Sequence, residues 1–235
     1  MLIFSYKYMF AIKKIIKSLI FKKKVAKDDL SILLSGARTK HLSPYNLTLP
    51  VSHLIPKDFI RQEPWEIEYL FMLAKRAKSG ILETGRWNGG SALVFKYANK
   101  NIPIYSIDIA PQNDTYFLTL LQKNNLSSDN LHLIVGDSQN SKYAEIKKYD
   151  LLFIDGDHSY NGCLNDLKNW FDGLEVGGHV VLHDCYFGCE VQDAVLDFTK
   201  DKNVRFFSSP YIPSYLSHKR LPNGSLCHFQ KLGNS

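Results

Sequence analysis

The chain has 235 residues, 45% of them hydrophobic, which is enough to bury one core as a single domain of upper-middle size. Its four cysteines are too few and too irregularly spaced for a disulfide scaffold or a zinc site, so reduced thiols in a cytoplasmic protein are expected. The net charge is +6, but residues 1–27 contain eight lysines and no acid, which leaves −2 for the rest. A near-neutral domain does not favour nucleic acid as a partner.

The first 27 residues are predicted to form a basic arm. Its apolar residues recur at helical spacing, with lysines between them: Ile12, Ile15, Ile16, Leu19 and Ile20. The apolar runs are too short to span a membrane, and lysines interrupt any signal-peptide core. Two interpretations stay open. In the first, residues 10–24 form an amphipathic helix that lies on the anionic inner face of a membrane. In the second, they form a helix that packs on the domain or on a second subunit of a homo-oligomer.

Residues 28–63 are irregular and rich in proline, and they are predicted to wrap over the active-site face. Helices and strands then alternate. The predicted helices cover residues 64–78, 89–100, 113–125, 141–148, 160–173 and 190–200. The predicted strands cover residues 81–84, 102–108, 131–135, 150–155, 179–184, 204–207 and 225–231. This alternation predicts an α/β fold with a Rossmann-like, doubly wound sheet of seven strands, flanked by helices. The sheet is mostly parallel, but no helix joins the last two strands, so the last strand is expected to be antiparallel.

The strongest functional signal lies between residues 149 and 186. Two continuous apolar runs, separated by a helix and a Gly-Gly turn, each end in polar residues, and open α/β sheets bind ligands at such carboxyl ends. The residues expected to converge there are Asp155, Asp157, His158, His183 and Asp184. Asp155 and Asp184 would repel each other without a cation, so they are hypothesised to bind Mg²⁺ or another divalent cation. Asp157 is expected to cap the following helix. His183 is interpreted equally well as a structural histidine or as a ligand.

A glycine-rich loop follows the first predicted strand, in the segment Glu83-Thr84-Gly85-Arg86-Trp87-Asn88-Gly89-Gly90-Ser91. Its glycines let the backbone approach a ligand closely at the start of a helix, although their spacing departs from the dinucleotide fingerprint and no Walker lysine is present. Asp108 ends the second strand, 23 residues after Gly85, where an acid binds ribose hydroxyls in Rossmann-type folds. Gly136-Asp137-Ser138 ends the third strand and could contact an adenine amino group. Because Glu83 would repel a phosphate, the ligand indicated is a nucleoside with a cationic or zwitterionic tail, such as S-adenosylmethionine.

These segments resemble the motifs of class I S-adenosylmethionine-dependent methyltransferases. The motifs are ILETGRWNGGSA, IYSIDIA, LIVGDS and FIDGDHSYNGCLNDLKNWFDGLEVGGHVVLHD. The branch resembled contains small-molecule and sugar O-methyltransferases with a methyltransferase domain of the family 24 type. It includes macrolide-sugar O-methyltransferases, proteins labelled rhamnosyl O-methyltransferase or cephalosporin hydroxylase and, more distantly, catechol-type enzymes. The resemblance covers residues 64–231 and implies that residues 64–235 form the methyltransferase domain.

The resemblance also implies roles for individual residues. Together with the interpretation of the glycine-rich loop, it implies the following cofactor-binding residues: Glu83, Gly85, Arg86, Gly89, Gly90, Ser91, Asp108, Asp137, Ser138 and Asp155. In the family, the acids at the positions of Asp155 and Asp184 bind the metal. His183 stands where the sugar enzymes carry a second acid, so either metal binding is weaker than in those enzymes, or His183 or water completes the metal shell. His158 occupies the position of the catalytic lysine of catechol-type enzymes and is assigned as the general base, with Asp155 as the second catalytic residue.

The predicted function is therefore metal-assisted O-methylation of a hydroxyl on a sugar, glycan or other small molecule by S-adenosylmethionine. Candidates for an aromatic wall beside the acceptor are Trp87, Phe207, Tyr211 and Tyr215. One alternative is an iron-dependent hydroxylase in which His158, His183 and a carboxylate form a facial iron site. Another is a non-catalytic, membrane-tethered partner protein that retains the fold, against which the intact acids and His158 argue.

Overall fold

The computed structural model describes residues 25–26, 59–139, 143, 146, 148–186, 188–207 and 226–234. The predicted amphipathic helix of residues 10–24 and most of the segment 28–63 lie outside these residues, as do Tyr211 and Tyr215. Within the described part, no helix is long and apolar enough to cross a bilayer. The four cysteines carry free thiols, as expected.

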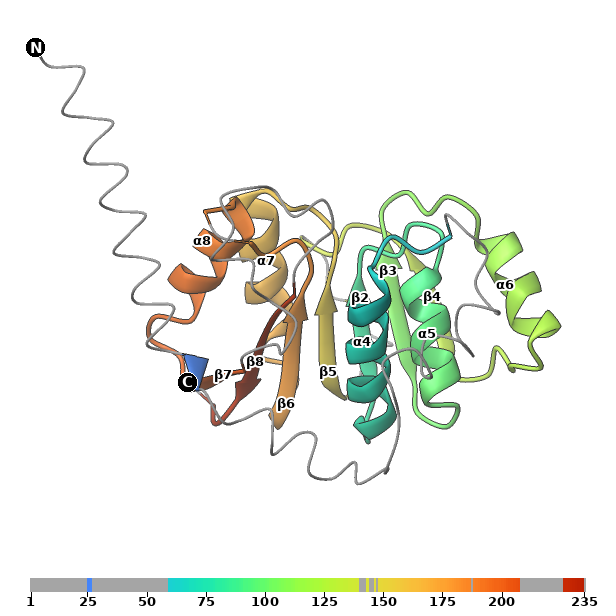
Figure 1. Ribbon diagram of the computed structural model, residues 1–235, viewed down its shortest axis with the longest axis horizontal. Coiled ribbons are helices and arrows are strands. Elements are labelled where there is room, and N and C mark those ends of the chain that lie inside the picture. Colours follow the sequence, from blue (N-terminus) through green and yellow to red (C-terminus); the bar gives the residue numbers. More distant parts are fainter. Residues whose placement is uncertain are drawn as a thin grey trace, which may run out of the picture.

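One sheet organises the molecule, and its strands lie in the order β1-β7-β8-β6-β5-β2-β3-β4 (Figure 1). Their bounds are β1 (Val25–Ala26), β2 (Ile81–Thr84), β3 (Ile104–Asp108), β4 (Leu131–Val135), β5 (Tyr149–Ile154), β6 (Leu174–Leu182), β7 (Val204–Phe207) and β8 (Cys227–Lys231). The pairs from β4 across to β6 are parallel, whereas β8 is antiparallel to both β6 and β7. The predicted seven-stranded sheet with an antiparallel last strand is confirmed. The two-residue strand β1 adds an unpredicted parallel edge beside β7.

Helices cover both faces of this sheet (Figure 1). They are α4 (Pro64–Arg76), α5 (Gly90–Ala98), α6 (Asp114–Lys123), α7 (Tyr160–Trp170) and α8 (Glu190–Phe198). Alternate residues of β5 enter different cores, because side chains of a strand alternate between its faces. Leu152 packs with α7 and α8, whereas Leu151 and Phe153 pack with α4 and α5. Both faces of β5 are thus buried, which explains its continuous apolar run.

Two local predictions differ from the structure. The Gly177–Gly178 pair was expected to form a turn, but it lies inside β6. Leu174 pairs with Tyr149 at the start of β5, and the ladder then shifts register before Leu151, so a bulge with Gly177 at φ 89° takes up the extra residues. The helix predicted at 141–148 is not seen at residues 143, 146 and 148, and its other residues lie outside the described part.

Candidate functional site

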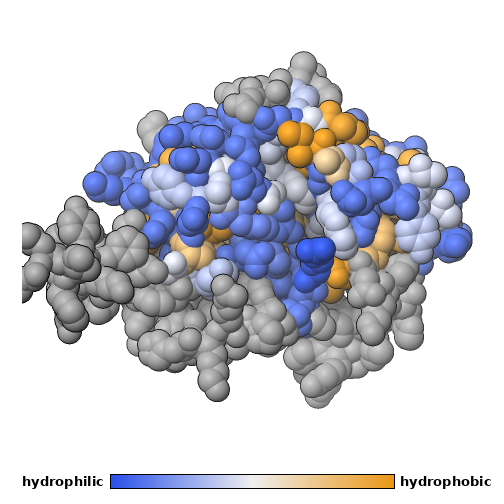
Figure 2. Space-filling view, turned by 90° about the horizontal axis from the view of Figure 1, so that it is seen from above, coloured by the Kyte–Doolittle hydropathy of each residue, from blue (hydrophilic) through white to orange (hydrophobic). Residues whose placement is uncertain are grey.

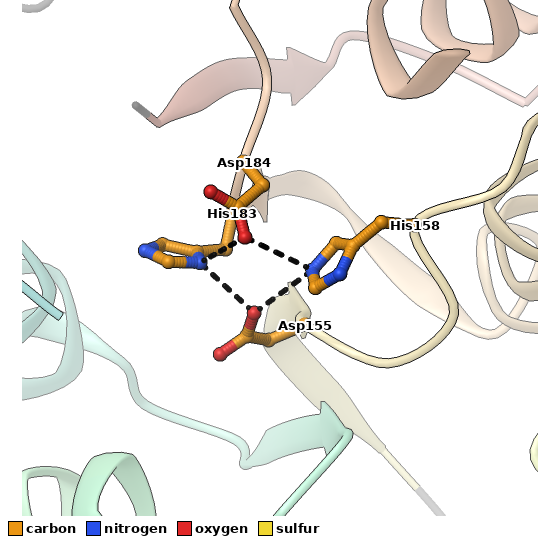
Figure 3. Close-up of side chains that lie close together, drawn as sticks. All are labelled: Asp155, His158, His183 and Asp184. Atoms are coloured by element: carbon orange, nitrogen blue, oxygen red, sulfur yellow. Dashed lines mark hydrogen bonds and ion pairs between the residues drawn. The ribbon is translucent and has the colours of Figure 1, made fainter. Parts of the chain in front are cut away.

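Four polar side chains meet at the carboxyl ends of β5 and β6, the two strands at the centre of the sheet (Figure 3). One ligand atom from each of Asp155, His158, His183 and Asp184 lies within 4.8 Å of the others. Nδ1 of His183 is 3.0 Å from Oδ1 of Asp155 and 3.3 Å from Oδ2 of Asp184. Nε2 of His158 is 3.2 Å from Oδ1 of Asp155 and 3.6 Å from Oδ2 of Asp184. The structure thus brings together four of the five residues that were expected to converge; we call these four the strand-tip cluster.

Strand register explains this convergence. Ile154 of β5 pairs with Leu182 of β6, so the next residues, Asp155 and His183, stand side by side. Asp184 then adopts a left-handed backbone with φ 52°, which Asp tolerates better than most residues, and the chain turns sharply after it. His158 reaches the cluster from the loop between β5 and α7.

Asp157 does not join the cluster, and its predicted role as a helix cap is wrong. The N-cap of α7 is Ser159, whose hydroxyl accepts a hydrogen bond from the amide of Gly162. Asp157 lies two residues earlier, where its carboxylate accepts hydrogen bonds from the amide of Ser159 and from Nε2 of Gln139. Both Asp and Ser favour positions before a helix, so composition alone did not distinguish them.

In the strand-tip cluster, the acids and the histidines stabilise each other's charged forms. Burial would raise the pKa of Asp155, but the charge of His183 and the hydrogen bond from His158 lower it. The hydrogen bond from His183 likewise lowers the pKa of Asp184. The hydrogen bond to Asp155 raises the pKa of His158. Burial opposes the charged form of His183, yet the carboxylates around it raise its pKa to about 12. The two acids are therefore ionised, and the protonated ring of His183 compensates their charge when no cation is bound.

The donor set fits a divalent cation. Two carboxylates supply hard oxygen ligands, and two imidazoles supply nitrogen ligands that suit Mn²⁺ and other transition metals. The buried carboxylate of Glu66 lies 3.0 Å from Nε2 of His183, on the side of the ring away from the cluster. A carboxylate behind a histidine in this way is typical of metal sites, because it holds the other ring nitrogen toward the metal. Sequence reasoning missed Glu66, which in sequence is only an acid in the first turn of a helix.

The strand-tip cluster opens into a cavity of about 440 Å³. The other residues that line it are Phe59, Ile60, Arg61, Gln62, Glu63, Gly85, Arg86, Trp87, Gly90 and Ser91. Residues 59–63, just before α4, form one wall, and the glycine-rich loop forms another. The guanidinium of Arg61 lies 4.3 Å from the centre of the Trp87 ring. Of the proposed aromatic wall, Trp87 lines this cavity, whereas Phe207 stacks on His228.

The loop glycines serve close packing of the strand tips. A Cβ on Gly85, which has φ 88°, would lie 2.1 Å from the carbonyl oxygen of Asp155. Gly89 adopts the same left-handed conformation, and a Cβ there would strike the Phe117 ring at 2.8 Å. A Cβ on Gly90 would lie 2.6 Å from that of Ile60. The loop can therefore bring β2, β5 and the wall of residues 59–63 together only because Gly85, Gly89 and Gly90 have no side chain.

Two predicted cofactor residues bind the protein itself. Glu83 is fully buried and accepts hydrogen bonds from the hydroxyls of Ser91 and Ser106, while burial raises its pKa to about 7. Glu83 is not among the residues that line the cavity, so it supports the loop from below. Arg86 lines the cavity, but both its Nε and Nη2 donate to Asp114 at 2.9 Å.

Asp108, Asp137 and Ser138, which were predicted to bind the nucleoside, are not among the residues that line the cavity. Asp108 accepts hydrogen bonds of 2.7 Å from the amides of Trp87 and Ala110. Asp137 accepts one of 2.8 Å from the amide of Gln139, and the carbonyl of Ser138 accepts one of 3.0 Å from the Trp170 indole.

Exposed apolar side chains stand next to these two acids. Ile109, which follows Asp108, is 71% exposed, and Val135, two residues before Asp137, is 65% exposed. Asp108 and Val135 are register partners at the ends of β3 and β4, so the pair lies at one edge of the sheet. Hydrophobic surface is visible on the face of the molecule seen from above (Figure 2). Sequence reasoning missed these two residues because each continues an apolar strand and gives no sign that it is exposed.

Comparisons with known proteins show similarity to methyltransferases. Residues 82–185, from β2 to the residue after Asp184, match a family model described as a methyltransferase domain. The fold resembles the O-methyltransferase NovP, with a TM-score of 0.56 and 16% identity over 72% of this chain and 80% of that one. It also resembles an SAH-bound methyltransferase from Podospora anserina, with a TM-score of 0.57 and 15% identity over 88% and 97% of the two chains. No curated protein matches the sequence significantly.

A third similar structure is a putative caffeoyl-CoA O-methyltransferase from Staphylococcus aureus, with a TM-score of 0.55 and 16% identity over 86% of this chain and 98% of that one. The domain match identifies residues 82–185 as a methyltransferase domain, and the strand order and the antiparallel β8 give the chain the fold of the S-adenosylmethionine-dependent methyltransferases of class I that it resembles. The matched region contains both the glycine-rich loop and all four residues of the strand-tip cluster. The resemblance of the motifs to this class is thereby confirmed.

Proposed function

We propose that the protein is a metal-assisted O-methyltransferase that modifies a hydroxyl of a sugar, glycan or other small molecule. The observation that carries this proposal is the convergence of two ionised carboxylates and two imidazoles on one point inside the cavity. A sugar hydroxyl has a high pKa, and activating it calls for a cation and a base at the same place.

The residues divide the work as follows. Asp155, Asp184 and His183 would hold Mg²⁺ or another divalent cation, which when bound lowers the pKa of a hydroxyl beside it. The side chain of His158 is 43% exposed and lines the cavity, so it can reach an acceptor. His158 accepts the hydroxyl proton as general base, and its contact with Asp155 fixes the orientation of its ring.

S-adenosylmethionine, the methyl donor, would bind across the glycine-rich loop. Gly85, Gly90 and Ser91 line the cavity next to the cluster and leave room for the amino-acid end of the cofactor. The exposed side chains of Ile109 and Val135 offer an apolar surface for the adenine, close to the predicted ribose acid Asp108. Exposed apolar groups next to acids at the ends of parallel strands suit a nucleoside, which has a flat apolar base and polar hydroxyls.

A saccharide acceptor is supported by the resemblance to sugar O-methyltransferases and by the lining of the cavity. Carboxylates, imidazoles, the amide of Gln62 and the guanidinium of Arg61 surround it, together with the ring of Trp87. Such a mixture of hydrogen-bonding groups with an aromatic face suits a polyhydroxylated ring. The lysines of residues 1–27 support a cytoplasmic location at a membrane surface, where a membrane-linked saccharide would be accessible.

The test combines binding with turnover. S-adenosylhomocysteine is titrated calorimetrically into wild type and Asp108→Ala, and we expect micromolar binding that the variant weakens. Methyl transfer from radiolabelled S-adenosylmethionine to a panel of saccharides is then measured after chelation and again after adding back Mg²⁺ or Mn²⁺. Turnover restored by the cation supports the proposal, whereas turnover that chelation does not change would exclude metal assistance. Because two imidazoles and a carboxylate can also bind iron, the same panel includes Fe²⁺ with 2-oxoglutarate, and hydroxylated product there would favour the hydroxylase alternative.

A further inference from the structure

We infer that Gln62, which lies just before α4, and Glu66, in the first turn of α4, are positioning residues that orient the ligands of the cation site. This inference rests on the proposed cation site and assigns a role to two residues that come from neither strand tip. Each contacts one member of the strand-tip cluster from outside. Glu66 lies 3.0 Å from Nε2 of His183, and Nε2 of Gln62 donates to Oδ2 of Asp155 at 2.6 Å.

Glu66 determines which nitrogen of His183 faces the cluster. Oε2 of Glu66 accepts the amide hydrogen of Glu63, so this oxygen is an acceptor and Nε2 of His183 carries the hydrogen in its contact with it. Nδ1 is then the nitrogen that points at Oδ1 of Asp155, 3.0 Å away, and at Oδ2 of Asp184, 3.3 Å away. Two carboxylate oxygens and Nδ1 face one point and form a ligand set for a cation that displaces the proton which Nδ1 donates to the carboxylates. Without Glu66 the ring could turn over or change tautomer, and the set would lose its nitrogen.

Gln62 performs the matching task for Asp155. Its amide binds one carboxylate oxygen, Oδ2, while the other, Oδ1, faces both His158 and His183. A carboxylate whose outer oxygen is held by an amide cannot rotate freely, so its inner oxygen keeps its direction. Gln62 is buried, although it lines the cavity, which makes this hydrogen bond inaccessible to most competing water.

The same contacts hold the start of α4 in place. Oε2 of Glu66 also accepts the amide hydrogen of Glu63 at 2.9 Å, as half of a capping box that begins the helix. Glu66 is fully buried, and His183 is 6% exposed. One carboxylate therefore joins the cavity wall of residues 59–63 to the metal-binding side of His183. A purely structural role as a helix cap would affect the stability of the fold but not its affinity for a cation.

The experiment separates these two roles by measuring Mn²⁺ affinity, cofactor affinity and stability on the full-length protein. Free Mn²⁺ is followed by electron paramagnetic resonance in titrations of wild type, Glu66→Gln, Glu66→Ala and Gln62→Ala. S-adenosylhomocysteine binding and thermal unfolding are measured on the same samples. The matched control is Glu68→Gln, which changes a second buried acid of α4 that is not among the residues lining the cavity.

We expect Glu66→Ala to weaken Mn²⁺ binding by about tenfold to a hundredfold, because supporting partners of metal ligands have effects of this size. Glu66→Gln should lose less, since its amide oxygen can still accept a hydrogen bond from Nε2 of His183. Gln62→Ala should bind Mn²⁺ about tenfold more weakly than wild type. Cofactor affinity should stay within about twofold in all three, and Glu68→Gln should leave Mn²⁺ affinity unchanged.

Three results would overturn the inference. Equal Mn²⁺ affinity in wild type and Glu66→Ala would reduce Glu66 to a helix cap and leave the cation site intact. If Glu66→Ala unfolds, Glu66→Gln decides the question, and a folded Glu66→Gln protein that loses Mn²⁺ no more than Glu68→Gln does would overturn the inference. Wild type that binds S-adenosylhomocysteine but no Mn²⁺ would overturn both this inference and the metal assistance in the proposed function.

Discussion

The two halves of the carboxyl edge use similar residues in different ways. At the ends of β5 and β6, the acids and histidines face one another across the cavity. At the ends of β2, β3 and β4, the polar groups bind to the protein itself. Glu83 is held by two serines, Arg86 is paired with Asp114, and Asp108 accepts two backbone amides. A strand-end acid is therefore not in itself a ligand; its partners determine its role.

The comparison also separates the acids by charge. Burial raises the pKa of Glu83 to about 7, and burial raises that of Asp166, under the loop, to about 6. The pKa values of Asp155 and Asp184 are instead lowered, because histidines lie beside them. Acids supported by hydroxyl groups can be protonated at little cost, whereas the two cluster acids remain ionised and attract a cation.

The largest effect is expected from Asp184→Asn, which removes a charged ligand of the proposed cation site and leaves the ends of β2, β3 and β4 unchanged. Asparagine tolerates the left-handed backbone at φ 52° as aspartate does, so the fold should persist. Loss of a charged ligand should reduce methyl transfer by at least about a hundredfold. Turnover and S-adenosylhomocysteine affinity are measured together, and we expect only turnover to fall. Turnover within twofold of wild type would show that Asp184 is dispensable.

The next-largest effect is expected where the two halves of the carboxyl edge touch, at Gly85 after β2 and Asp155 after β5. In Gly85→Ala the new Cβ would lie 2.1 Å from the carbonyl oxygen of Asp155, and the backbone has φ 88°. We expect a loss of about 3 kcal/mol in the free energy of unfolding, measured by urea denaturation. Gly177→Ala is the control: its φ is 89°, but no atom lies within 4 Å of the new Cβ, so about 1 kcal/mol is expected. Equal losses would refute the close-approach argument.

A comparable effect on stability should follow from Asp166→Asn, and it should depend on pH. Burial raises the pKa of Asp166 to about 6, against the opposing hydrogen bonds from Ser138 and Thr84. The folded state thus holds a proton that the unfolded state releases near pH 4, so the contribution of Asp166 is full at lower pH and is lost as pH rises through 6. Between pH 4 and pH 7, the free energy of unfolding of the variant should rise relative to that of wild type by up to about 3 kcal/mol. A difference that does not change with pH would mean that the carboxyl is ionised throughout.

The smallest effect is expected from Ile109→Ser, which tests the proposed adenine surface and not the cation site. Ile109 is 71% exposed, so its removal should not alter the free energy of unfolding noticeably. If the adenine covers this side chain, S-adenosylhomocysteine binding should weaken by about 1 kcal/mol, or roughly fivefold. Mn²⁺ affinity should be unchanged. Unaltered cofactor affinity, measured by calorimetry, would place the adenine elsewhere.

Local patterns were enough for the elements of the fold. The strands at residues 81–84, 131–135 and 204–207 have the predicted bounds, and five of the six predicted helices differ only at their ends. The sixth, predicted at 141–148, is not seen at residues 143, 146 and 148. Apolar runs and proline or glycine boundaries are short-range signals, so they could be interpreted directly. The short strand β1 was not predicted, because its pairing with β7 joins segments about 180 residues apart in sequence.

By itself, the sequence determined the alternation of strands and helices with an antiparallel last strand, and the resemblance to a class of enzyme. It also determined the convergence of Asp155, His158, His183 and Asp184, although it wrongly added Asp157, because residues that follow adjacent parallel strands must meet at one edge. Only the tertiary structure decided the partners of those residues. Glu66 reaches His183 across 117 residues, and Asp114 and two serines occupy Arg86 and Glu83. Such contacts depend on how helices pack on the sheet and which side chains are buried, and no spacing along the chain encodes this geometry.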